Sequence, residues 1–162
     1  MKKIILFLLI LTFFLGCVSE NNSSIEKDFL ELKEEYFVLN SFNPNENIMN
    51  SYLNEISLLR SNSPTYFNNI LDVEIASSQS FLYFSKALDE SKKINYFSNH
   101  CNSIDYKNTI NYLNLSIKYS NKAKSIILLP NEIQFLRENQ LETINGINLF
   151  SKELLESIKD TC

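Results

Sequence analysis

Three cysteines and one histidine are the side chains of this 162-residue chain best suited to nucleophilic or metal chemistry. They are Cys17, Cys101, Cys162 and His100. A catalytic relay of His, Asp and Ser would have to be built around His100, and a di-iron helical bundle needs two Glu-x-x-His pairs. A single histidine excludes the di-iron site. We therefore expect no catalytic residues, no cofactor and no enzymatic activity.

His100 and Cys101 are neighbours in sequence and offer two ligands of the kind that soft metals prefer. A structural zinc site has four ligands, and catalytic zinc sites use three from the protein. Two further ligands are not apparent in the sequence, and Cys101 would also have to be a free thiol. We expect no metal site here.

Glu74 is the carboxylate whose position is most informative. It lies between Leu71 and Ser78 on an apolar helical stripe, so the carboxylate must be paired, exposed or in a cavity. The segment that follows, ASSQS at 76–80, is small. A pocket for an apolar ligand is one interpretation, and close packing of helices is the other. The residues predicted to line such a pocket are Glu74, Ser77, Phe81 and Phe84.

The first 16 residues have the pattern of an export signal. Lys2 and Lys3 precede an apolar block from Ile4 to Leu15 that only Thr12 interrupts. As a helix this block would rise about 18 Å, against about 30 Å for the hydrocarbon core of a bilayer. The block is therefore too short for a comfortable membrane span, and we expect a signal peptide at 1–16.

Phe14-Leu15-Gly16-Cys17 resembles the lipobox of prokaryotic membrane lipoproteins, in which a small residue precedes a modified cysteine. The resemblance implies cleavage before Cys17, a lipid on the Cys17 thiol and often a further acyl chain, such as palmitate, on the new N-terminus. Phe14 and Leu15 depart from the pattern, which more often has leucine and then a small residue. The resemblance covers about 20 residues. An uncleaved N-terminal anchor and ordinary secretion are the alternatives.

Export would place the remaining cysteines outside the reducing cytoplasm. If Cys17 carries lipid, Cys101 and Cys162 can pair only with each other, and we expect a disulfide between them. Two free thiols are the alternative. The predicted helices between these cysteines would return Cys162 to the level of Cys101, because each rises 1.5 Å per residue in opposite directions.

The charge balance is acidic. The whole chain has a net charge of −4, and loss of Lys2 and Lys3 would leave 13 basic against 19 acidic residues. This balance disfavours binding to nucleic acid and to an anionic membrane surface. We expect attachment to the cell membrane through the lipid anchor, which would need two or more acyl chains to be stable.

Hydrophobic spacing beyond the signal is helical, and the chain contains only two glycines. Start signals at Asn43-Pro44 and Ser63-Pro64, and a turn at Pro130, divide this pattern. A loop is predicted at 95–105. Helices are predicted at 24–39, 44–60, 64–93, 106–128 and 131–159.

We expect an all-α fold, an antiparallel bundle of about five helices with three of them long, in residues 25–162. Residues 17–24 would form the lipidated N-terminus and a tether. The expected function is that of an extracytoplasmic, lipid-anchored module for protein interaction or envelope structure. The alternative is a ligand-binding or sensory lipoprotein that uses a pocket near 76–80.

Overall fold

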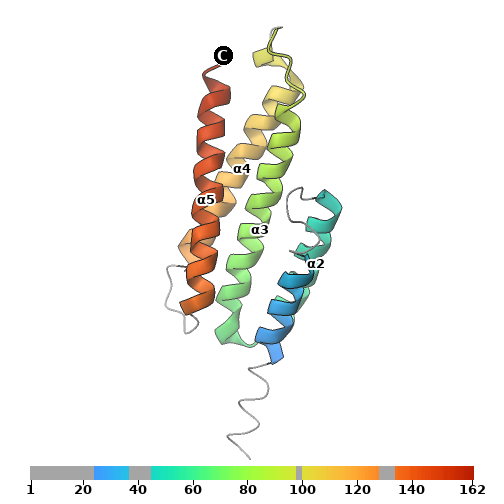
Figure 1. Cartoon of the computed structure of the whole chain (residues 1–162), viewed down its shortest axis with the longest axis vertical. Coiled ribbons are helices and arrows are strands. Elements are labelled where there is room, and N and C mark those ends of the chain that lie inside the picture. Colours follow the sequence, from blue (N-terminus) through green and yellow to red (C-terminus); the bar gives the residue numbers. More distant parts are fainter. Residues whose placement is uncertain (1–23, 37–44, 98–99, 128–133) are drawn as a thin grey trace, which may run out of the picture. The chain divides into compact units, whose positions relative to one another are not determined.

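The computed structural model describes residues 24–36, 45–97, 100–127 and 134–162. All regular secondary structure in these ranges is helical, which confirms the predicted all-α fold (Figure 1). The chain divides into two compact units, residues 1–41 and 42–162. The assignment of residues 25–162 to one domain stays a prediction.

The described part of the first unit is a helix over residues 24–36. Lys27 and Glu31 form an ion pair at 3.5 Å along one turn. The Lys33 ammonium lies over the ring of Phe29, 5.4 Å from its centroid. These i, i+4 contacts support a short helix, and the predicted extension to residue 39 lies outside the described residues.

The second unit is a helical bundle. Its described helices are α2 (Glu46–Asn62), α3 (Thr65–Ser91), α4 (Ile104–Ile127) and α5 (Gln134–Lys159), with a short 3₁₀ helix, η1 (His100–Asn102), before α4. The long helices α3, α4 and α5 run antiparallel in succession, and α3 contacts each of the other three (Figure 1). Cavity-free packing of such helices depends on small and apolar residues at the contacts.

The residues that cap the first turns of α2 and α3 are not the predicted ones. Asn45 caps α2 by accepting the Asn47 N–H at 2.9 Å, whereas the predicted cap at Asn43-Pro44 lies outside the described residues. The predicted cap of α3 at Ser63 is wrong. The Ser63 hydroxyl bonds to the Arg60 carbonyl and to Asn68, so Pro64 occupies the N-cap position without a side-chain bond.

Helix α4 begins two residues earlier than predicted. The Ser103 hydroxyl accepts the Tyr106 N–H at 3.1 Å, and the Ser103 carbonyl accepts the Lys107 N–H at 3.2 Å. A serine that satisfies the first free amides of a helix stabilises that end. The predicted loop at 95–105 is therefore wrong for Ile104 and Asp105, which are helical.

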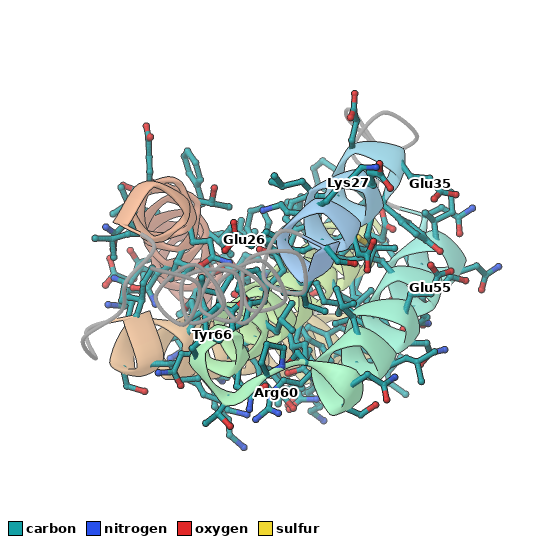
Figure 2. The ribbon with its side chains drawn as sticks, turned by 90° about the horizontal axis from the view of Figure 1, so that it is seen from below. Glu26, Lys27, Glu35, Glu55, Arg60 and Tyr66 are labelled. Carbon is teal, nitrogen blue, oxygen red and sulfur yellow. A yellow bond between two sulfur atoms is a disulfide. The ribbon has the colours of Figure 1, made fainter. Side chains whose placement is uncertain are left out.

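A two-point ion pair joins α2 to α3. Arg60 lies near the end of α2 (Figure 2). It donates from Nε to Asp72 Oδ1 at 2.8 Å and from Nη2 to Oδ2 at 3.1 Å. Asp72 raises the pKa of the guanidinium by this hydrogen bonding. Both side chains are about one-third exposed, so the pair orients the two helices more than it stabilises them.

Two clusters of buried apolar residues lie within the described part of the second unit. The first joins α3, α4 and α5 toward the end where α4 finishes, and the second joins them near the opposite end. The first comprises Val73, Ala76, Ala123, Ile127 and Ile144, and the second comprises Ala87, Leu113, Leu155 and Ile158. Ala at three of these positions lets the helices approach closely.

None of the described helices combines the length and the apolar character that crossing a membrane requires.

Candidate functional site

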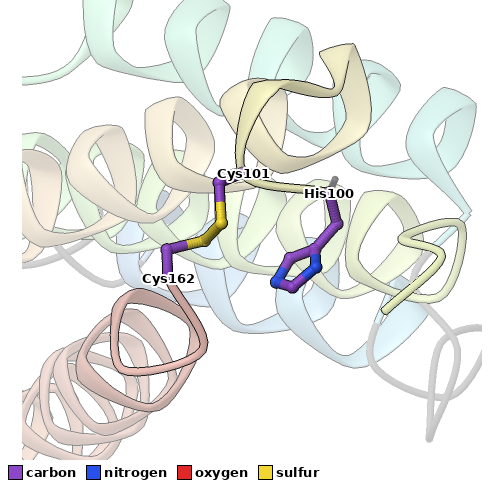
Figure 3. Close-up of side chains that lie close together, drawn as sticks. All are labelled: His100, Cys101 and Cys162. Atoms are coloured by element: carbon purple, nitrogen blue, oxygen red, sulfur yellow. A yellow bond between two sulfur atoms is a disulfide. The ribbon is translucent and has the colours of Figure 1, made fainter. Parts of the chain in front are cut away.

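A disulfide joins Cys101 to Cys162, with 5.7 Å between their Cα atoms (Figure 3). Cys101 belongs to η1, directly before α4, and Cys162 follows the end of α5. The bridge closes a segment with a sequence separation of 61. It thus ties the start of α4 to the end of α5, at the level where the predicted helix lengths place both cysteines.

His100 lies beside this disulfide (Figure 3). Its Nε2 atom is 3.1 Å from the Thr161 hydroxyl, and the rings of Tyr96 and Tyr106 lie 5.0 Å and 6.3 Å from the imidazole. Among the described residues, one group of potential metal ligands has its ligand atoms within 4.8 Å of one another. It comprises His100, Cys101 and Cys162.

Glu74 is buried within the bundle and is held by hydrogen bonds from two other helices. Tyr52 on α2 donates its hydroxyl to Oε1 at 2.9 Å, and Gln140 on α5 donates its amide to Oε2 at 2.9 Å. Gln140 also donates to the Ile70 carbonyl at 3.3 Å. Of the three expectations for Glu74, the structure shows a buried and partnered carboxylate. A buried charge must be partnered in this way.

The pKa of Tyr52 is shifted by its own burial and by its contact with Glu74. Desolvation raises the pKa of its phenol far above the usual value, and the negative charge of Glu74 and the hydrogen bond to it raise that pKa further. All three causes disfavour a phenolate. Tyr52 therefore acts as a hydrogen-bond donor that stays protonated, and its chemistry is structural.

The other residues predicted for a pocket have separate surroundings. Ser77 is buried and donates to the Glu74 carbonyl at 3.0 Å within its own helix. Phe84 packs against the buried cluster of Ala87, Leu113, Leu155 and Ile158. Phe81 is partly buried. A ligand pocket at these residues stays a prediction.

The small-residue segment of α3 includes Ser80, which contacts α4. Ser80, Ser116 and Ser151, from α3, α4 and α5, are fully buried, and we call them the serine layer. Ser80 donates to the Ser116 carbonyl at 2.8 Å, and Ser116 donates to the Ser80 carbonyl at 2.9 Å. The Ser151 and Ser116 hydroxyl oxygens are 2.8 Å apart. Nearby, Asn148 on α5 donates to Ser120 and Asn121 on α4.

Three tyrosines stack on the surface between α3 and α4. The rings of Tyr83 and Tyr119 are 5.5 Å apart at an angle of 6°, and those of Tyr83 and Tyr112 are 6.1 Å apart at 26°. We call these partly buried residues the tyrosine platform. The Lys86 ammonium lies 5.9 Å from the ring centroids of Tyr83 and Tyr112, and pairs with Glu46 of α2 at 2.7 Å.

The predicted site residues include none of the serine layer and none of the tyrosine platform. The signal for the layer is present in α4, where buried positions recur at helical spacing and four of them are small or polar, at Thr109, Ser116, Ser120 and Ala123. For the platform, Tyr112 and Tyr119 are seven residues apart and share one helix face. Tyr83 joins them only through tertiary packing.

Cys17, the predicted lipid-attachment residue, lies outside the described residues. Comparison of the chain with protein-family models, with curated proteins and with solved structures finds no match. Functional inference must therefore start from the side chains of the chain itself.

Proposed function

We propose that this protein is a non-enzymatic, lipid-anchored module on the extracytoplasmic side of the cell membrane, and that it binds a partner protein of the envelope. The observation that carries the proposal is the tyrosine platform on α3 and α4. The N-terminal resemblance to lipoproteins supports the anchor, and the helical bundle supports a role as a binding scaffold.

The platform has the chemistry of a protein-binding surface. Tyrosine is enriched at protein interfaces because it offers a large apolar ring and a hydroxyl that can hydrogen-bond. Tyr83, Tyr112 and Tyr119 already hold one another in a stack, so little side-chain freedom is left to lose on binding. Such rigid aromatic residues are frequent among those that contribute most to affinity.

The charge beside the platform limits the class of partner. Lys86 is held between the tyrosine rings and Glu46, so a cation and an anion lie at one edge of the aromatic surface. With a net charge of −4, the chain does not favour nucleic acid. A protein segment with apolar side chains and a few polar groups is the partner that fits.

The scarcity of catalytic groups supports a binding role. The one histidine of the chain, His100, contacts Thr161 and two tyrosine rings beside a disulfide. Among the buried polar side chains, Glu74 is engaged by Tyr52 and Gln140. These contacts hold the bundle together.

Site-specific photocrosslinking in intact cells tests the partner. A photoreactive phenylalanine analogue at position 119 should give one discrete protein adduct, because its ring would replace a platform ring. The matched control is the same analogue at Lys107, an exposed residue about 18 Å away along the same helix. Tyr112→Ala should lower the adduct yield at position 119. Equal adducts from positions 119 and 107, or none from 119, would contradict the proposal.

Detergent phase partitioning tests the anchor separately. The full chain should enter the detergent phase, and Cys17→Ser should move it to the aqueous phase. Cys101→Ser is the matched control and should leave partitioning unchanged. Detergent-phase behaviour of Cys17→Ser would support an uncleaved anchor instead.

A further inference from the structure

The end of the bundle that carries the disulfide also holds a histidine. This histidine is close enough to both cysteines for the three side chains to bind one metal ion together. One ligand atom from each of His100, Cys101 and Cys162 lies within 4.8 Å of the other two (Figure 3). The sequence brings His100 and Cys101 together as neighbours. The return of α5 along α4 supplies the third residue.

We propose that reduction of the Cys101–Cys162 disulfide converts this cluster into a three-ligand site for a soft divalent metal, with Zn²⁺ as the expected ion. This proposal is independent of the lipid anchor and of the tyrosine platform. The metal and the disulfide exclude each other, because thiolate sulfur is the ligand that zinc binds.

The spacing of the three groups suits a tetrahedral ion after small movements. Zinc binds sulfur at ~2.3 Å and imidazole nitrogen at ~2.0 Å, so tetrahedral ligand atoms lie roughly 3.5 Å apart. The two sulfurs must therefore separate once their bond is broken, and the imidazole, whose ligand atom lies within 4.8 Å of both, must approach by about 1 Å at most. Two thiolates and one neutral imidazole form a ligand set of known preference for zinc, with the fourth position open to water.

Access from solvent allows both reduction and metal entry. Cys162 is exposed, and His100 and Cys101 are partly exposed. The rings of Tyr96 and Tyr106 flank the imidazole and restrict its orientation. Thr161 contacts His100 Nε2 in the disulfide form, so one imidazole nitrogen already has a partner that can orient it.

The chemistry balances with a dithiol or phosphine as reductant. The reductant supplies two electrons and water or the dithiol supplies two protons, so the S–S bond breaks and two protein thiols form. The dithiol becomes a disulfide, or the phosphine becomes its oxide with oxygen from water. Binding of Zn²⁺ then releases two protons from the thiols.

Cobalt titration of the full chain in detergent tests the site. Co²⁺ is a spectroscopic substitute for Zn²⁺, and thiolate ligation gives charge-transfer absorption in the near ultraviolet. After reduction with a phosphine without oxygen, one equivalent of Co²⁺ should produce these bands, and Zn²⁺ should displace it. The oxidised protein should give none. Cys17→Ser should behave as the parent chain does.

Two variants identify the ligands. His100→Ala should weaken Co²⁺ binding by at least about tenfold, because loss of even an outer partner of a metal ligand costs this much. Cys162→Ser should abolish the charge-transfer bands. Asn102→Ala is the matched control, an exposed neighbour in η1 that should change nothing.

The melting temperature is a second measurement, and it shows whether the reduced protein is still folded when it binds the metal. Zn²⁺ should raise the melting temperature of the reduced protein and leave that of the oxidised protein unchanged. The proposal is overturned if the reduced chain, with two titratable thiols, gives no thiolate bands or no rise in melting temperature. It is also overturned if His100→Ala binds Co²⁺ as tightly as the parent chain, or if the disulfide cannot be reduced in the folded protein.

Discussion

The hydroxyl of Ser80 donates to the backbone carbonyl of Ser116, and the hydroxyl of Ser116 donates to the backbone carbonyl of Ser80. With both protons used in this way, the contact between Ser116 and Ser151 requires Ser151 to be the donor. All three hydroxyls are thus satisfied without water. These two reciprocal hydroxyl-to-carbonyl hydrogen bonds require α3 and α4 to lie close together.

Removal of one hydroxyl from the serine layer should destabilise the bundle. We expect Ser116→Ala to lower the free energy of unfolding by about 1–3 kcal/mol, because Ser151 loses its acceptor and Ser80 loses a donor to its carbonyl. Urea denaturation measures the difference. Ser125→Ala on the exposed side of α4 is the control and should change stability by less than about 0.5 kcal/mol. Equal effects of the two variants would show that the layer contributes nothing.

Tyr52 should contribute less stability at high pH. The folded state holds the phenol proton more tightly than the unfolded state, since folding raises the pKa of Tyr52. Its contribution is therefore complete below about pH 10, where an unfolded tyrosine titrates, and it falls by about 1.4 kcal/mol for each pH unit above that.

Comparison with Tyr52→Phe isolates this effect. At pH 8 the variant should be less stable than the parent by about 1.5–3 kcal/mol, the usual contribution of a hydrogen bond to a charged group. At pH 11 the difference should be smaller by about 1.4 kcal/mol. Denaturant unfolding at the two pH values measures it, with the exposed Tyr96→Phe as control. A difference that does not change with pH would contradict the burial of the phenol beside Glu74.

Gly146 offers a position where the protein can be stabilised. It lies inside α5, and a Cβ atom added there would meet no atom within 4 Å. We expect Gly146→Ala to raise the free energy of unfolding by about 0.5–1 kcal/mol, because alanine loses less backbone freedom in a helix. Thermal and urea unfolding measure the gain. A loss of stability would mean that the helix is bent or crowded at this point.

The disulfide should make a large contribution to stability. Replacing Cys101 and Cys162 together by Ser should lower the free energy of unfolding by about 4 kcal/mol, from the lost restriction of the unfolded chain. The loop that it closes has a sequence separation of 61. Thiol titration checks the premise. In a Cys17→Ser background, the unreduced protein should take up no thiol reagent, and uptake of two equivalents would mean that the bridge is absent.

The helix pattern was predictable because it depends on local spacing. In the last helix, for example, Ile144 and Ile158 are 14 residues apart, a spacing that keeps both on one helix face, and both are buried. Helix ends were less predictable, since they depend on which side chain reaches which amide. Ser63 was expected to cap α3, yet its hydroxyl bonds back to Arg60 in the preceding helix.

The polar contacts between helices could not be predicted from sequence spacing. Glu74 was recognised as anomalous, but its partners Tyr52 and Gln140 are 22 and 66 residues away. Only the packed structure brings them together. The nearness of His100 to Cys162 was predictable, because His100 is next to Cys101 in the sequence and the predicted helix lengths return Cys162 to the level of Cys101.

Two polar layers lie at different heights along the described parts of α3 and α5. Glu74 meets Gln140 in one, and the serine layer links Ser80 through Ser116 to Ser151 in the other. Apolar side chains can exchange neighbours when a helix slides along its axis, because dispersion forces have no direction. Hydrogen bonds require fixed geometry, so a shift of α5 by one turn, about 5.4 Å, would break both layers together. These few polar residues therefore set the axial register of the long helices.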